Sequence, residues 1–275
     1  MKTIISASRR TDIPAFYLNW LKNHMNKGFI NVPNPFNRKQ LKYVSLSANE
    51  VGWIVLWSRN YGPFLKQYQF FQDFNLFFHF TVNPAHKLLE PDMISPAKAV
   101  TQMEKLVSLY DPKFIIWRYD PIVFYQSRSG VESNHDGNVL REYLEKFSAL
   151  GLKRCYLSFV HLYPKVLKRV KRLKDFKFIE LSIEKKNEIL REMADLALHY
   201  DMQLFSCSND KLLNVPGVQK GHCIDGKMLN QLINLPVSEK TLPTRPDCGC
   251  TVSIDIGDYV DTPCKYKCLY CYARR

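Results

Sequence analysis

The sequence predicts an α/β fold, a TIM-like (β/α)8 barrel, and three observations lead to this prediction. Apolar runs of strand length alternate with segments of helical period along the chain. Runs such as 53–57 and 114–119 are apolar almost throughout, which is typical of strands buried on both faces of a parallel sheet. The length of 275 residues is close to the roughly 250 typical of such a barrel.

Eight strands are expected, at residues 4–8, 29–32, 53–57, 76–82, 114–119, 155–160, 203–207 and 251–256. Helical patterns open at Pro14 and cover 96–109, 138–150 and 182–200, the last with Ser182 as its cap. The alternation implies βαβ units and a mainly parallel sheet. An incomplete or permuted barrel and a doubly wound open sheet are the alternatives. We expect a single domain, 1–275, with 211–275 as a cysteine-rich, metal-binding segment packed on it.

The composition excludes several classes of protein. Hydrophobic residues make up 46% and charged residues 24%, so the chain is not disordered, collagen-like or a coiled coil. It contains no apolar run long enough for a membrane helix, and Arg9 and Arg10 come too early for a signal peptide. We therefore expect a cytoplasmic protein with no membrane partner. In that compartment its eight cysteines are more typical of metal or redox sites than of disulfides.

Polar residues follow the expected strands directly, at the end where α/β barrels carry their active sites. Candidate catalytic residues are Arg9, Arg10 and Asp12 after the first strand, and Arg118 and Asp120 at the end of the fifth. Arginines there can bind a carboxylate or phosphate, which predicts a small-molecule or nucleotide-like anionic substrate. The alternative is that Asp12 and Asp120 only cap helices or pair with a neighbouring arginine.

Three further polar residues are assigned from their positions. Asn60, after the third strand, is a candidate cofactor contact. His79, inside a strand, is expected to be a core residue, whereas His161 at a strand end is a candidate acid or base.

The most specific motif is C-x3-C-x2-C at Cys264, Cys268 and Cys271, with Tyr270 before the third cysteine. Three thiolates on one loop can hold three irons of a [4Fe-4S] cluster and leave the fourth iron open to a ligand. A zinc knuckle with a fourth ligand is the alternative.

This spacing, with Tyr270, resembles the signature of the radical S-adenosylmethionine enzymes. The resemblance implies S-adenosylmethionine as a cofactor, bound through its amino and carboxylate groups and cleaved by one electron to a 5′-deoxyadenosyl radical. In that superfamily the loop follows the first strand, whereas here it follows the last. In a closed ring both loops lie on the same face. The glycine-rich cofactor motifs of the superfamily are missing.

A second set of cysteines consists of Cys207, Cys223 and the pair Cys248 and Cys250, which flank a glycine. Four thiolates are the complement of a structural zinc ion or of a second, closed cluster. The alternative is that they are small buried apolar residues. Cys155, at the start of a strand, is expected to be one of these.

Nearly the whole chain resembles the bacterial family catalogued as domain of unknown function 1848. The matching segments are 5–17, 34–36, 117–121, 223–225, 248–250, 255–257 and 264–273. The resemblance implies one domain and strengthens the strand-end residues as site candidates, and Asp255 is a further candidate cofactor contact. It brings no established reaction with it.

The net charge of +13 has a local peak at residues 165–177, where a helical pattern with a basic outer face is expected. Two classes of function follow. The first is a redox enzyme with a [4Fe-4S] cluster over the barrel mouth, supplied by an electron donor protein. The second is a zinc-stabilised protein without redox chemistry that binds nucleic acid through the basic run.

Overall fold

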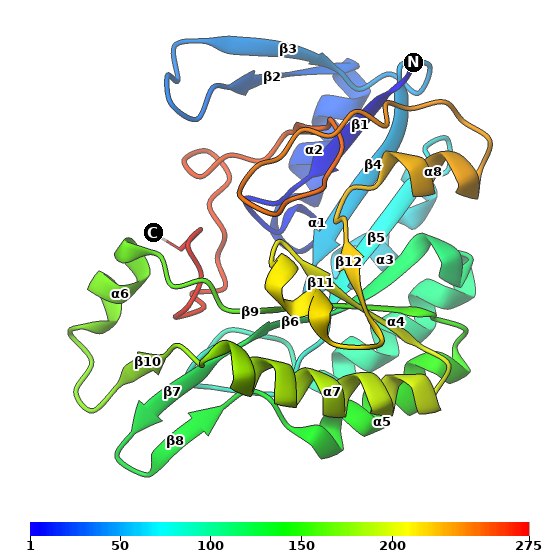
Figure 1. Cartoon of the computed structure of the whole chain (residues 1–275). Coiled ribbons are helices and arrows are strands. Elements are labelled where there is room, and N and C mark those ends of the chain that lie inside the picture. The colour runs from blue at the N-terminus through cyan, green and yellow to red at the C-terminus, as the bar shows by residue number, and fades with distance from the viewer. Residues whose placement is uncertain (275) are drawn as a thin grey trace.

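The computed structural model describes residues 1–274, and its centre is an eight-stranded parallel sheet (Figure 1). Its strands, in chain order, are β1 (Thr3–Ala7), β4 (Val51–Ser58), β5 (Leu76–Thr81), β6 (Ile115–Ile122), β9 (Arg154–Phe159), β11 (Gln203–Cys207), β12 (Val218–Gly221) and β13 (Ile254–Asp255).

The strands lie in the sheet in the order of the chain, except that the last strand returns to lie beside the first. β13 pairs with β1, and β12 forms the opposite edge. This is the strand order of a (β/α)8 barrel, without the reversal of a doubly wound sheet. Within residues 1–274, however, β12 and β13 are not paired. The α/β prediction is therefore confirmed, whereas a closed barrel is not observed. We call the open side between β12 and β13 the seam.

The second expected strand, 29–32, does not belong to the parallel sheet. It forms β2 (Phe29–Pro33), which pairs antiparallel with an unexpected strand, β3 (Leu41–Ser45). Burial alternates along β2, so only one of its faces packs on the protein, as suits a hairpin outside the main sheet. The sheet still has eight strands because β12, which was not expected, belongs to it. β12 is short and its two central residues are exposed, so it left no apolar pattern in the sequence. The strand expected at 251–256 is confined to Ile254–Asp255.

Helices connect the parallel strands, and the long ones match their sequence patterns. α4, α5 and α7 coincide within one residue with the predicted helices, and the side chain of Ser182 caps α7 as expected. The pattern from Pro14 is divided at Tyr17 into two helices. The helices are α1 (Ile13–Phe16), α2 (Leu18–Lys27), α3 (Gly62–Leu65), α4 (Pro96–Leu109), α5 (Gly137–Ala149), α6 (Pro164–Val170), α7 (Ile183–His199) and α8 (Gly226–Leu232), with 3-10 turns at Tyr68–Phe71, Pro112–Phe114 and Asp210–Asn214.

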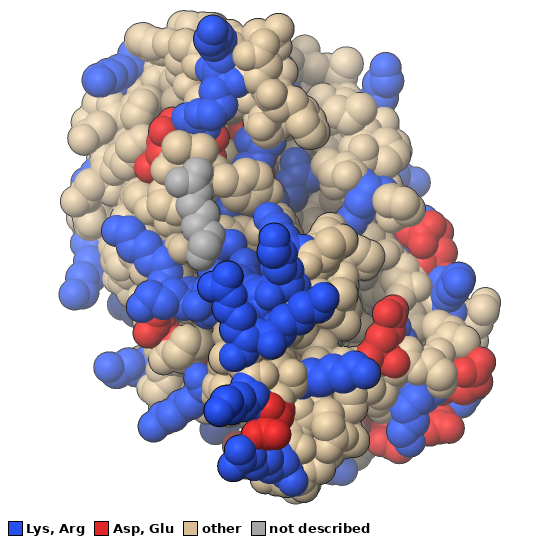
Figure 2. All heavy atoms as spheres, turned by 90° about the vertical axis from the view of Figure 1, so that its left-hand side faces the viewer, with Lys and Arg blue, Asp and Glu red and all other residues tan. Residues whose placement is uncertain are grey.

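A second small sheet lies beside α6. It contains β7 (Phe124–Ser127), β8 (Gly130–Ser133) and β10 (Lys177–Ile179), all antiparallel. The helix expected over the basic run is shorter than predicted, because α6 ends at Val170 and the chain then turns into β10. Lysine and arginine side chains nevertheless gather on the face that carries α6 (Figure 2).

The two faces of the parallel sheet bury different cores because successive side chains of a strand point to opposite sides. One face, including Ile54, Phe78 and Trp117, packs against the helices, and Cys155 is buried there as expected. The other face, including Val55 and Phe77, packs instead against the cysteine-containing segment that crosses the seam. No helix within residues 1–274 has the length and apolar character needed to cross a membrane.

Replacing Leu56 tests the helix-side core. This β4 side chain is 0% exposed, so Leu56→Ala leaves a cavity and should lower the free energy of unfolding by about 2–5 kcal/mol. Leu198→Ala is the control, because Leu198 is 77% exposed on α7 and should change that energy by no more than about 0.5 kcal/mol. Urea unfolding followed by circular dichroism measures both, and equal losses would contradict this core.

Candidate functional site

Polar side chains lie at the carboxyl ends of the strands, on the sheet face that packs against the cysteine-containing segment; we call this the inner face. Trp57 and His79 lie opposite one another on β4 and β5 and stack, with ring centroids 4.1 Å apart. The Arg118 guanidinium lies over the Trp57 ring, 5.6 Å from its centroid. His79 is fully buried and its Nε2 bonds the Cys223 carbonyl at 2.7 Å. Because side chains alternate between the two faces along each strand, these polar groups all lie on one face.

Asp255 joins the two strands that come from opposite ends of the chain. Its carboxylate accepts hydrogen bonds from the Ser6 hydroxyl (3.0 Å), the Ser8 hydroxyl (2.5 Å) and the Arg9 amide (2.8 Å). Because β13 contributes only two residues to the sheet, these side-chain bonds supplement a short ladder. They fix the loop that follows β13 beside the loop that follows β1.

The C-terminal cysteine loop, residues 264–273, packs on the segment that follows β1. The Tyr17 hydroxyl donates to the Pro263 carbonyl at 2.7 Å, and the Tyr272 hydroxyl donates to the Arg9 carbonyl at 3.0 Å. The rings of Phe16 and Tyr266 lie 4.5 Å apart. Cys264, Cys268 and Cys271 belong to one apolar cluster that includes Phe16, Tyr266 and Tyr272. The motif therefore lies at the strand ends, although it is the last segment of the chain.

A buried arginine connects this loop to the sheet. Arg59, directly after β4, pairs with Glu90 at 2.8 Å. The same guanidinium donates to the Tyr270 hydroxyl at 2.8 Å and to the Asp120 carbonyl at 2.9 Å. Tyr270 in turn donates to Glu90. The aromatic residue of the motif is thus held by an ion pair between the residue that follows β4 and a residue in the loop after β5.

Arg169 on α6 holds the same loop from outside. It donates to the backbone carbonyls of Leu269 (3.1 Å), Cys271 (3.0 Å) and Arg274 (2.7 Å). Figure 1 places α6 beside the terminal loop. One residue of the basic run therefore binds the cysteine loop instead of facing a partner.

Arg118 and Asp120 form an ion pair at the end of β6. Arg118 Nη2 lies 2.6 Å from Asp120 Oδ2, and Arg118 Nη1 lies 3.3 Å from the Cys223 sulfur. Asp120 also accepts a bond from Ser158, and its backbone amide donates to Asn83 Oδ1 at 2.9 Å. Burial alone would raise the pKa of Asp120, but the Arg118 charge, the hydrogen bonds from Ser158 and Arg118, and the Arg59 charge together outweigh burial and lower that pKa. The pair links the two cysteine sets, because Asp120 is also bonded to Arg59.

The second cysteine set gathers across the seam. The sulfurs of Cys207 and Cys223 lie 3.1 Å apart, Cys250 interacts with the Cys223 thiol, and Cys248 interacts with that of Cys250. All four side chains are buried. Burial opposes ionisation of Cys248, but hydrogen bonds from Thr244 and Cys250 lower its pKa to about 7. The four residues that the sequence suggested as one set are therefore neighbours.

Neither cysteine set is arranged around a metal centre as it stands. Within residues 1–274, no group of three or more histidine, cysteine, aspartate or glutamate side chains has the geometry to hold a metal ion. Burial raises the pKa of Cys264 to about 11, so that thiol holds its proton at neutral pH. Binding of a metal would have to displace that proton.

Other predicted residues have structural partners, and their functional roles stay predictions. Asp12 caps α1 and accepts bonds from the Ser58 hydroxyl and the Arg59 amide, and burial raises its pKa to about 6. Arg10 donates to the Gly257 carbonyl at 3.1 Å. Asn60 Oδ1 accepts a bond from Gln102 at 2.8 Å.

The predicted residues Arg9 and His161 differ in burial. Arg9 bonds Ser253 and Asp255, but its Nη1 is buried without a partner. His161 is exposed.

Sequence reasoning missed three residues that hold the site together. Arg59 is one of several polar residues that follow the third expected strand, and it was not named as a candidate. Arg169 was treated only as a member of the basic run 165–177. Glu90 lies in a loop after β5 and gave no signal, because nothing in its neighbourhood marks it as the partner of Arg59. Only the contacts between distant segments identify it.

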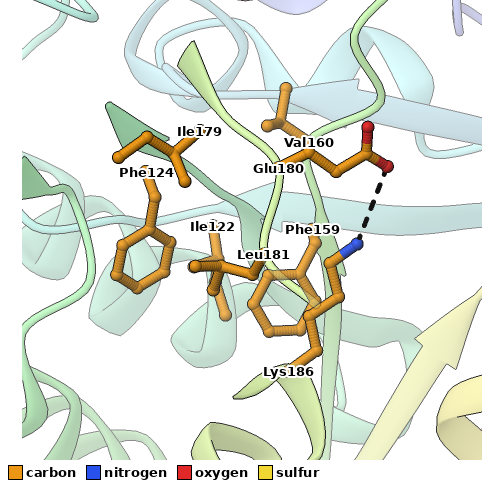
Figure 3. Close-up of a pocket in the computed structure, with 8 residues that line it drawn as sticks. All are labelled: Ile122, Phe124, Phe159, Val160, Ile179, Glu180, Leu181 and Lys186. Carbon is orange, nitrogen blue, oxygen red and sulfur yellow. Dashed lines mark ion pairs between the residues drawn. The ribbon is translucent and has the colours of Figure 1, made fainter. Parts of the chain in front are cut away.

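A small hollow lies beside the ends of β6 and β9, away from the cysteines (Figure 3). Its walls are mainly apolar, and Lys186 and Glu180, 4.0 Å apart, form an ion pair at its rim. Its lining residues are Ile122, Phe124, Phe159, Val160, Ile179, Glu180, Leu181 and Lys186. It contains none of the residues predicted to be catalytic.

Fold and site together define an α/β protein whose parallel sheet carries two groups of cysteines at its strand ends. The chain belongs to the family described as Domain of unknown function (DUF1848), whose model matches residues 4–273. No curated protein matches the chain.

Solved structures resemble the chain only distantly. They include a D-hydantoinase from Bacillus sp. AR9 (13% identity, TM-score 0.33, 60% of this chain and 36% of that one). A second D-hydantoinase has 12% identity and a TM-score of 0.32, covering 60% and 35%. Streptococcus suis SuiB bound to S-adenosylmethionine has 10% identity and a TM-score of 0.32, covering 85% and 46%. The alignments thus span between about a third and a half of those longer chains.

Replacing Arg169 tests how the cysteine loop is held. Arg169→Gln removes charged donors from three carbonyls, and bonds of this kind contribute about 1.5–3 kcal/mol. Amide hydrogens of residues 264–274 should therefore exchange roughly tenfold faster or more. Lys168→Gln, an exposed neighbour with the same charge change, is the control. Hydrogen exchange with mass spectrometry compares the two, and equal rates would contradict the role of Arg169.

Proposed function

We propose that the chain is an iron–sulfur enzyme of the radical S-adenosylmethionine type, built on an open α/β barrel. Cys264, Cys268 and Cys271 would hold a [4Fe-4S] cluster at the strand ends. The observation that carries the proposal is the packing of this loop on the segment after β1 through Tyr17 and Tyr272. We take residues 1–275 as one domain, with 211–275 as its cysteine-rich segment.

The thiols are not arranged around a metal ion as they stand, but the chemistry of the residues in and around the loop suits such a cluster. The donor set is three thiols on one short loop, packed among apolar and aromatic side chains, with Cys268 buried and Cys264 and Cys271 partly buried. Arg59, buried beside Tyr270, brings positive charge toward a cluster of thiolates. The Nη1 of Arg9 is buried beside the loop without a hydrogen-bond partner, and an anionic group such as a carboxylate would satisfy it. Three thiols leave one iron without a protein ligand, which is the position for a cofactor.

The cluster, when bound, would supply single-electron reduction of S-adenosylmethionine at the open iron. The chain's own residues would do the rest. Arg59 and Glu90 fix Tyr270 and so the position of the loop. Arg118, held in place by Asp120, would orient an anionic, small-molecule or nucleotide-like substrate through its guanidinium. The electron would come from a separate donor protein.

Metal analysis of anaerobically purified protein tests the proposal. After reconstitution with iron and sulfide, the chain should be brown, with about four irons bound by the loop and a reducible paramagnetic signal. Cys268→Ser should lose most of that iron. The control is Cys155→Ser, because Cys155 lies in the helix-side core. A colourless protein, or iron retained by Cys268→Ser, would reject the cluster.

A second candidate function is nucleic-acid binding by a zinc-stabilised chain. The exposed basic side chains around α6 favour it (Figure 2); they are Lys165, Lys168, Lys171, Arg172, Lys174 and Lys177. Backbone phosphates bind such a surface by releasing counterions.

Neutralising the exposed basic side chains tests whether this surface binds nucleic acid. Changing those six exposed side chains to glutamine leaves Arg169 and the cysteine loop intact. If the surface binds nucleic acid, affinity for a single-stranded oligonucleotide should fall at least tenfold, and wild-type affinity should fall steeply with salt. Fluorescence anisotropy measures both. Affinity that is unchanged in the variant would remove the nucleic-acid function.

A further inference from the structure

The second cysteine set lies where the parallel sheet is open. Cys207 is the last residue of β11, and Cys223 follows β12 by two residues. Cys248 and Cys250 stand in the chain that leads back to β13. The chain segments on the two sides of the set are already bonded, because the Thr251 amide donates to the Ile224 carbonyl at 2.9 Å. The four thiols therefore bridge the seam.

The thiols also lie close together in a buried place. Cys207 Sγ and Cys223 Sγ are 3.1 Å apart, and the contacts continue through Cys250 to Cys248. Gly249 between the last two has no room for a side chain, since a Cβ there would lie 2.4 Å from His222 Nε2. The turn that presents both thiols is thus packed tightly in place.

Positive charge faces these sulfurs. Arg118 Nη1 lies 3.3 Å from the Cys223 sulfur, and the Arg245 side chain interacts with Cys207. Neutral thiols would gain little from two guanidinium groups. Four thiolates around a divalent ion carry two negative charges in excess. Arg245, together with Arg118, whose charge is shared with Asp120, would offset part of that excess.

The separation of the sulfurs favours one ion over a cluster. With zinc–sulfur bonds near 2.3 Å, a tetrahedral site separates neighbouring sulfurs by about 3.8 Å. The 3.1 Å between the sulfurs of Cys207 and Cys223 is shorter than this, so zinc binding would move these two sulfurs apart by about 0.7 Å. In a four-iron cluster each thiolate binds a different iron, which spreads the sulfurs farther apart.

We propose that Cys207, Cys223, Cys248 and Cys250 bind one zinc ion as four thiolates and that this ion joins the edges of the sheet across the seam. As the structure stands, the four thiols are neighbours but do not surround a common point. Zinc binding would therefore have to shift their side chains so that the four sulfurs enclose the ion. Each protonated thiol releases its proton to solvent as its sulfur–zinc bond forms, and no electron is transferred. The site is independent of the cluster proposed for the C-terminal loop, because the two sets share no residue.

The experiment uses the full chain with Cys264→Ser, Cys268→Ser and Cys271→Ser together, which removes the other cysteine set. Elemental analysis should find about one zinc ion per chain and no iron. Chelation of the zinc should make the four remaining seam thiols reactive. Replacement by cobalt should give the sulfur-to-cobalt absorption bands of a tetrahedral thiolate site.

Adding Cys223→Ser to this chain should reduce bound zinc at least tenfold, whereas adding Cys155→Ser should leave it unchanged. Because a core substitution can unfold the chain, the metal content of the triple variant decides by itself. A zinc-free triple variant, iron at these cysteines, or a Cys207–Cys223 disulfide detected by mass spectrometry would overturn the proposal. Iron in the wild-type loop is measured separately, so the two proposals fail independently.

Discussion

The structure of the strand-end region depends on the bonds that Asp255 makes to the opposite end of the chain. Asp255 binds the Ser6 and Ser8 hydroxyls and the Arg9 amide, and so fixes β13 beside β1. Only because these strands are adjacent can a loop at the C-terminus lie over the segment that follows the first strand. A short strand with two residues in the sheet has few backbone bonds of its own, so its position rests on this carboxylate.

A chain of polar contacts then connects the two cysteine sets. It begins at Tyr270, passes through Glu90 and Arg59 to the backbone of Asp120, and continues through Arg118 to Cys223. Buried charges of this kind are destabilised when a partner is removed, so each residue in this chain depends on its immediate partner. The C-terminal loop and the seam are consequently parts of one polar layer at the strand ends.

Much of the fold was predictable from the sequence, because buried strands and amphipathic helices leave strong local patterns. The seven long elements 51–58, 76–81, 115–122, 154–159, 96–109, 137–149 and 183–199 follow such patterns. β12 and the hairpin of β2 with β3 were not predictable in the same way. β12 is short and half exposed, and the apolar residues of β2 do not say whether its partner is parallel or antiparallel.

The sequence by itself determined the candidate site residues, through the spacing of Cys264, Cys268 and Cys271 and the polar residues after the strands. Residue type and local spacing are properties of the chain, so they need no fold. The tertiary structure alone decided which residues meet. It placed Glu90 against Arg59, Arg169 against the cysteine loop, and Cys207 beside Cys223. Such contacts join segments far apart in sequence, and they exist only once the strand order brings those segments together.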